Sequence, residues 1–156
     1  MQYEELLKAF GESLGLGDFP QEHGPVAIDV DGMPIAFVHK PETDRIVLLG
    51  TVGEPPPEAA GRFGALLLQA NFMFEASESC TLAQNPEGGT YVLQRELPLE
   101  FLDVGKLQST LEGFANTLER WRRALLDFRP LEESAGTVSA GEPAPPRFGG
   151  DGFIAV

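Results

Sequence analysis

The chain has 156 residues and a formal net charge of −13 at pH 7, from 24 Asp and Glu against 11 Lys and Arg. This length suits one domain that buries its own core without metals or disulfides. Because the acidic balance repels phosphate groups, we expect neither nucleic acid nor a membrane surface as a partner. Cys80 is the only cysteine, so no internal disulfide or cysteine-clustered zinc site is possible, and a cytoplasmic setting is expected.

The first residues predict a helix followed by three strands. Apolar residues recur every three or four positions from Tyr3 to Leu14, and Gly-Leu-Gly at 15–17 ends this helix. Alternating apolar and polar residues then predict a strand over 26–30, and further strands are expected at 34–40 and 45–51. Asp31-Gly32 and residues 41–44 form the turns between them. Three consecutive strands on short turns imply an antiparallel meander.

A second helix is expected from about Pro57 to Phe74. The proline run before it is compatible with this start, because prolines are tolerated in the first turn of a helix. The expected helix contains ALLLQANFMF at 65–74, in which only Gln69 and Asn71 are polar. A helix on a protein surface needs apolar residues along one face only, and the apolar residues of this segment extend beyond one face. The helix is therefore expected to lie inside the domain or to bury one face against another molecule.

A hairpin and a long helix complete the predicted domain. Strands at 80–85 and 90–97 flank the turn Pro-Glu-Gly-Gly. A helix follows from about Asp103, with apolar residues three or four apart as far as Phe128. Residues 1–129 are thus expected to form one domain, whereas residues 130–156 are rich in Pro, Gly and Ser and are expected to be disordered.

The sequence gives little indication of catalysis. His23 and His39 have no histidine partner at metal-ligand spacing, and a lone cysteine such as Cys80 is usually a small buried apolar residue. Asp29 and Asp31 share a predicted strand face but lack the other ligands of a calcium loop. No glycine-rich stretch has a phosphate-binding pattern. We therefore expect a protein that is not an enzyme and has no metal or cofactor.

Several segments together resemble the class I chaperones of bacterial type III secretion, the Tir chaperone family. The matching pieces cover about residues 1–129, in the order helix, meander, helix, hairpin, helix. They are YEELLKAFGESLGL, PVAIDVDGMPIAFVHKPETDRIVLLG, LLLQANFMF, CTLAQNPEGGTYVLQREL and LEGFANTLERW. The most telling of them is the Leu-Leu-x-x-Asn-Phe pattern of residues 67–72.

The resemblance implies an α+β homodimer of the secretion-chaperone type in the bacterial cytoplasm. Such a protein would hold the N-terminal segment of one secreted effector soluble and ready for secretion, without ATP hydrolysis. The secretion ATPase or the sorting apparatus would be a further partner. The resemblance also implies that the second helix carries much of the dimer interface, here assigned to Phe63, Leu66, Leu67, Ala70, Asn71 and Phe74.

An extended peptide is bound through apolar pockets and sometimes through an open strand edge. The first helix and first strands offer apolar side chains for such pockets, and at least half of these are needed for the core. The expected effector-binding residues are Leu6, Phe10, Leu14, Val26, Ile28, Ile35 and Phe37.

Two other hypotheses remain open at this point. The same fold could serve outside secretion, as a regulator or toxin-masking protein that acts by stoichiometric binding. An enzyme built on the acidic strand face of Asp29 and Asp31 is the third hypothesis.

Overall fold

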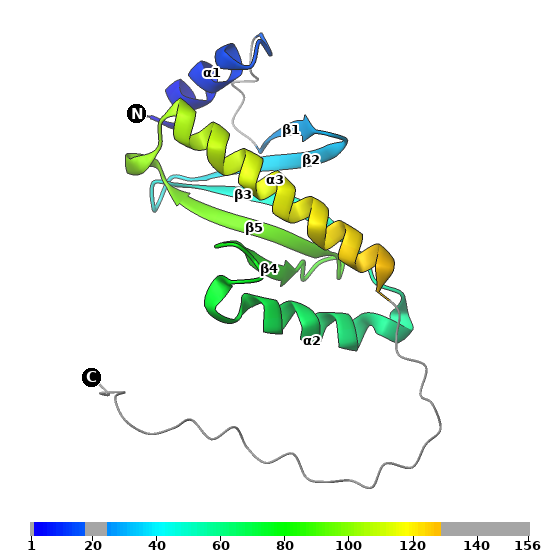
Figure 1. Ribbon diagram of the computed structural model, residues 1–156. Helices are drawn as coiled ribbons and strands as arrows, with labels where there is room; N and C mark the ends of the chain where they lie inside the picture. The colour runs from blue at the N-terminus through cyan, green and yellow to red at the C-terminus, as the bar shows by residue number, and fades with distance from the viewer. Residues whose placement is uncertain (1, 18–24, 129–156) are drawn as a thin grey trace, which may run out of the picture.

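The computed structural model describes residues 2–17 and 25–128 and has an α+β architecture (Figure 1). The expected order of helix, meander, helix, hairpin and long helix is confirmed. His23 and the predicted tail at 130–156 lie outside the described residues. The main elements are α1 Tyr3–Ser13, β1 Val26–Val30, β2 Met33–Lys40, β3 Arg45–Gly53, α2 Ala60–Asn71, β4 Thr81–Gln84, β5 Tyr91–Pro98 and α3 Val104–Asp127.

The five strands form one antiparallel sheet in the order β1-β2-β3-β5-β4. The second strand of the β4–β5 hairpin therefore pairs with β3, while the first strand becomes an edge. The two edge strands, β1 and β4, lie at opposite ends of the sheet (Figure 1). They are also the shortest strands, with five and four residues. Short edge strands limit unwanted pairing with other chains.

Helices α1 and α3 pack on one face of the sheet, whereas α2 lies along its β4 edge (Figure 1). Helix α3 crosses β3, and α1 packs beside α3 at the β1 end (Figure 1). The core between these layers contains the fully buried Phe10, Phe37, Phe63 and Phe114. The side chain of Asp103 accepts a hydrogen bond from the Lys106 amide at 2.7 Å, which caps the first turn of α3.

Helix α2 is shorter than the sequence predicts. A single 3₁₀ turn, η1, spans Pro57–Ala59, and the regular helix ends at Asn71. The expected continuation to Phe74 is instead a kinked turn, η2 (Phe72–Phe74), in which Met73 and Phe74 both have a φ of 57°. Non-glycine residues rarely adopt this left-handed conformation, so the helical pattern does not continue.

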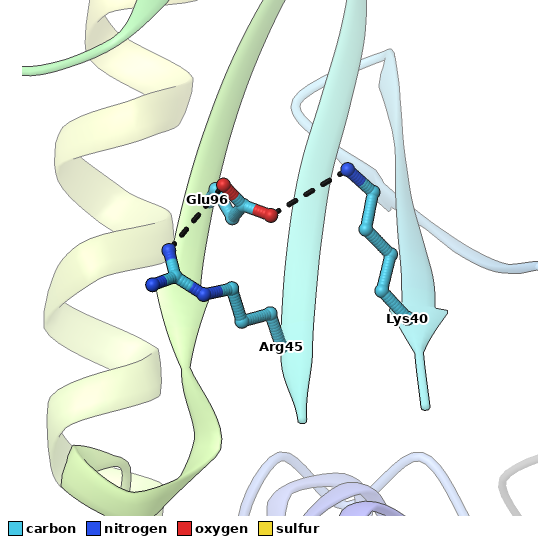
Figure 2. A network of polar contacts seen from close by, with 3 residues as sticks. All are labelled: Lys40, Arg45 and Glu96. Atoms are coloured by element: carbon cyan, nitrogen blue, oxygen red, sulfur yellow. Dashed lines mark hydrogen bonds and ion pairs between the residues drawn. The ribbon is translucent and has the colours of Figure 1, made fainter. Parts of the chain in front are cut away.

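The other face of the sheet carries an ion-pair network that joins three neighbouring strands (Figure 2). Glu96 of β5 lies 3.5 Å from the Lys40 ammonium of β2 and 3.4 Å from the Arg45 guanidinium of β3. All three side chains are exposed, and exposed ion pairs contribute little to stability. This network is therefore a feature of the surface and not a source of the fold's stability.

Candidate functional site

An open cavity of about 660 Å³ lies between the end of α1, strand β1 and the first half of α3. We call it the α1–β1 groove. Its apolar lining comes from all three elements and consists of Phe10, Leu14, Leu16, Ala27, Ile28, Val30 and Leu111. Its polar lining consists of Asp29, Asp31, Gln108 and Glu112. A concave apolar surface with a few polar groups is the usual form of a binding site.

The end of α1 places two leucines beside this groove. Gly15 has a φ of 68°, its amide bonds to the carbonyl of Glu12, and the Leu16 amide bonds to the carbonyl of Gly11. This pattern is a Schellman motif, which ends a helix and turns the chain. Leu14 and Leu16 follow the last helical residue and are 40% and 53% exposed. Their exposed area is available to a partner.

A tight turn fixes the acidic corner of the groove. Asp31 and Gly32 both have positive φ values, 52° and 78°, as a two-residue hairpin turn of type I′ requires. The carboxylate of Asp29 accepts a hydrogen bond from the Gly32 amide at 2.8 Å. The expected Asp-Gly turn is confirmed, and it holds Asp29 and Asp31 at the end of β1.

Strand β1 also offers a free edge next to the groove. Within the described residues it pairs only with β2, through Val26 to Val30 against Phe37 to Met33. Its outer side therefore presents main-chain donors and acceptors that an added strand can use. The side chains of Ile28 and Val30 face the groove beside this edge.

The predicted effector-binding residues divide into two groups. Phe10, Leu14 and Ile28 line the groove, but Phe10 is itself fully buried, so only Leu14 and Ile28 present exposed area there. The remaining four are buried in the core, with exposures of 6% or less, and are Leu6, Val26, Ile35 and Phe37. Sequence reasoning did not assign Leu16, Val30 or Leu111 to the site. The alternation of Val30 with Asp29 and Asp31 could have indicated that Val30 lines the site. The positions of Leu16 and Leu111 could not be inferred in this way, because they depend on how α1 and α3 pack together.

A second apolar surface lies at the end of α2, which we call the α2 patch. It consists of Leu68, Phe72, Met73 and Phe74, which are between 54% and 74% exposed. Of the predicted dimer residues, Phe63, Leu67 and Ala70 are buried within the protomer, and Leu66 packs partly against the core. Only Phe74 is strongly exposed. The association itself remains a prediction, but Leu68 of α2 and the three η2 residues form an apolar surface that is open to a partner.

Polar contacts hold the α2 patch in place. The Asn71 amide nitrogen donates to the carbonyl of Leu82, and its oxygen accepts from the Leu82 amide, both at 2.9 Å. Glu78 accepts a hydrogen bond from Thr117 at 2.6 Å and pairs with Arg120 at 2.7 Å. The Thr117 hydrogen bond is the main cause that lowers the pKa of Glu78. Helix α2 and the following loop are thus tied to β4 and α3.

The described residues contain no arrangement that indicates catalysis. No group of His, Cys, Asp and Glu among them could hold a metal ion. His39 stacks on Tyr3 with ring centroids 4.2 Å apart and is not part of such a group. Cys80 is buried, and burial raises the pKa of its thiol, which disfavours the reactive thiolate. None of the described helices combines the length and apolar character of a membrane span.

Comparison with known proteins identifies the family. The Tir chaperone protein (CesT) family model matches residues 5–122, so the chain belongs to this family. The resemblance to class I type III secretion chaperones is thereby confirmed. A comparison with curated proteins finds no match.

Solved structures share the fold. A chain of the HopA1–SchA chaperone–effector complex is 24% identical with a TM-score of 0.63, and the match covers 78% of this chain and 94% of that chain. A chain of the heterodimeric ExoU–SpcU complex from the type III secretion system of Pseudomonas aeruginosa is 18% identical with a TM-score of 0.63, covering 76% and 97%. YbjN from E. coli, described as a candidate transcription regulator, is 14% identical with a TM-score of 0.56, covering 77% and 89%.

Proposed function

We propose that this protein is a type III secretion chaperone that binds the N-terminal segment of one secreted effector. The observation that carries this proposal is the α1–β1 groove, an apolar cavity beside a free strand edge in a chain of the Tir chaperone family. An unfolded segment can add main-chain hydrogen bonds at β1 and place alternate side chains in the groove. Binding of this kind needs no ATP hydrolysis and no catalytic group.

We further propose that the protein acts in the bacterial cytoplasm as a homodimer joined through the α2 patch. Four neighbouring exposed apolar side chains would otherwise remain in contact with water. The family and the complexes of its structural relatives support an effector as the other partner. Transfer of the effector to the secretion ATPase or sorting apparatus remains a prediction from the resemblance.

The test is to isolate the tagged protein from its native bacterium and to identify bound proteins by mass spectrometry. We expect one dominant secreted protein, held through its N-terminal region at one copy per two chains. The variant Leu14→Asp, which places a charge in the groove, should lose this protein while its circular dichroism and melting temperature remain close to those of the wild type.

Two results would overturn the proposal. Recovery of a resident cytoplasmic protein in place of a secreted one would favour the alternative, a regulator or toxin-masking protein of the same fold. Retention of the secreted protein by Leu14→Asp at wild-type levels would show that the groove is not the binding site. Phe101→Asp serves as the matched control, because Phe101 is 68% exposed and does not line the groove.

A further inference from the structure

The charges around the α1–β1 groove have one sign. Asp29, Asp31 and Glu112 line it, and its described lining contains no lysine or arginine. Within the described residues, none of these three carboxylates forms an ion pair. The recorded partners are neutral, since Asp29 accepts from the Gly32 amide and Glu112 accepts from Gln108 at 3.3 Å. The groove therefore carries negative charge that a cationic partner could neutralise.

The position of these carboxylates relative to β1 sets a pattern. Successive side chains of a strand point to opposite faces, so Ile28 and Val30 share the groove side and Asp29 lies between them. A strand added at the free edge would place every second side chain beside Ile28 and Val30. The side chains between them would lie opposite Asp29 at cross-strand separations of about 4.5 to 5.5 Å, within reach of an ion pair.

Resting on the function proposed above, we propose that the groove selects a client segment with apolar residues at alternate positions and Lys or Arg between or beside them. The apolar residues enter the cavity lined by Leu14, Ile28 and Leu111. The basic residues lie against Asp29 along the strand and against Asp31 and Glu112 at the rim. Asp29, Asp31 and Glu112 are then specificity residues of the groove.

The net negative charge of the whole protein would not by itself produce a preference for this alternating pattern. The whole chain carries −13, so any basic peptide is attracted at long range. A contact at the groove differs in two ways: it requires alternation of apolar and basic residues, and it depends on three particular carboxylates. Both requirements can be tested separately from the general field.

The probes are fluorescent nine-residue peptides measured by anisotropy with the full-length protein. One alternates Val with Lys, a second alternates Val with Glu, and a third has the first composition with its valines contiguous. We expect the first to bind at least tenfold more tightly than the second and third. Equal binding of the first and third peptides would overturn the proposal, as would failure of the first to bind.

Two variants with equal net charge locate the contact. The groove variant combines Asp29→Asn, Asp31→Asn and Glu112→Gln, and the carboxamide introduced at position 29 retains an oxygen for the turn hydrogen bond. The control combines Glu58→Gln, Glu87→Gln and Glu100→Gln, which are exposed residues outside the groove. The groove variant should weaken Val-Lys binding at least fivefold and the control less than twofold. Equal weakening by both would show that only the long-range field acts.

These experiments distinguish a failure of the proposed charge selection from a failure of the proposed chaperone role. If the native secreted protein is recovered equally by the wild type and the groove variant, and the peptides show no preference, the charge selection is wrong while the chaperone role stands. If no secreted protein is recovered but the peptide preference and its loss in the groove variant are observed, the groove selection holds and the chaperone role fails.

Discussion

Gly50 of β3 lies directly beneath Leu118 of α3. A Cβ atom added at Gly50 would collide with a methyl carbon of Leu118, closer than real side chains pack. Leu118 is completely buried, so it has little room to move. The absence of a side chain at Gly50 is what allows the long helix to lie close to the centre of the sheet.

Gly50→Ala should destabilise the protein by about 1 to 3 kcal/mol, because extra volume in a packed core forces side chains and backbone to shift. Chemical denaturation measures this loss. The control is Gly61→Ala in α2, where an added Cβ meets nothing within 4 Å. Because alanine favours a helix more than glycine does, this variant should raise the free energy of unfolding by about 0.5 to 1 kcal/mol. A Gly50→Ala protein as stable as the wild type would show that α3 is not held at this distance.

Leu68→Asp combined with Phe72→Asp should convert the proposed dimer to a monomer without unfolding it, because both residues are more than 70% exposed in the protomer. Light scattering gives the mass, and circular dichroism checks the fold. Leu67→Asp is a poorer test, because Leu67 is 4% exposed and a charge there would disrupt the core. A double variant with the wild-type dimer mass would remove the α2 patch from the interface.

Asn71→Ala should cost about 1 to 3 kcal/mol, since two hydrogen bonds to the main chain of Leu82 are lost together. Amide hydrogen exchange at Leu82 should become faster than in the wild type. Asn71→Asp keeps an acceptor for the Leu82 amide but sets a carboxylate oxygen against the Leu82 carbonyl, so this variant should be destabilised as well. Unchanged exchange at Leu82 in Asn71→Ala would contradict this account.

Glu78→Gln should lower the melting temperature at pH 7 and have little effect in acid. The pKa of Glu78 in the folded protein lies below its ordinary value of 4.5, mainly because Thr117 donates a hydrogen bond to the carboxylate. A depressed pKa contributes stability that is complete above pH 4.5 and is lost as the pH falls through the folded-state pKa. Melting curves of both proteins should therefore converge in acid, whereas a gap independent of pH would exclude the ionised carboxylate as the cause.

The order of elements could be predicted from the sequence because each has a local pattern. Alternation marks the strands, Asp31-Gly32 marks a turn, and the spacing of three and four residues marks α3. The break at Phe72 could not be predicted, since FMF continues an apolar helical pattern. The flanking Asn71 and Glu78 bond to Leu82 and Thr117, which are distant in the sequence. Local propensity is overridden by such contacts.

The candidate site was predicted less completely than the fold. Apolar residues of α1 and β1 could face a core or a groove, and the choice depends on where α3 crosses them. Leu6 and Phe37 are covered and Leu14 is left open. The close packing at Gly64 could not be predicted from the sequence either. A Cβ there would lie 3.1 Å from the hydroxyl of Tyr91, a residue distant in the sequence.

The strand order places the free edge of β1 and the α2 patch at opposite ends of one sheet. Four spacings of about 4.8 Å separate β1 from β4, so in a dimer joined through α2 the two grooves would be roughly 40 Å or more apart. One polypeptide would need at least about 12 fully extended residues to occupy both. The second groove would then be filled at the high effective concentration set by that tether, so client length as well as local sequence would determine avidity.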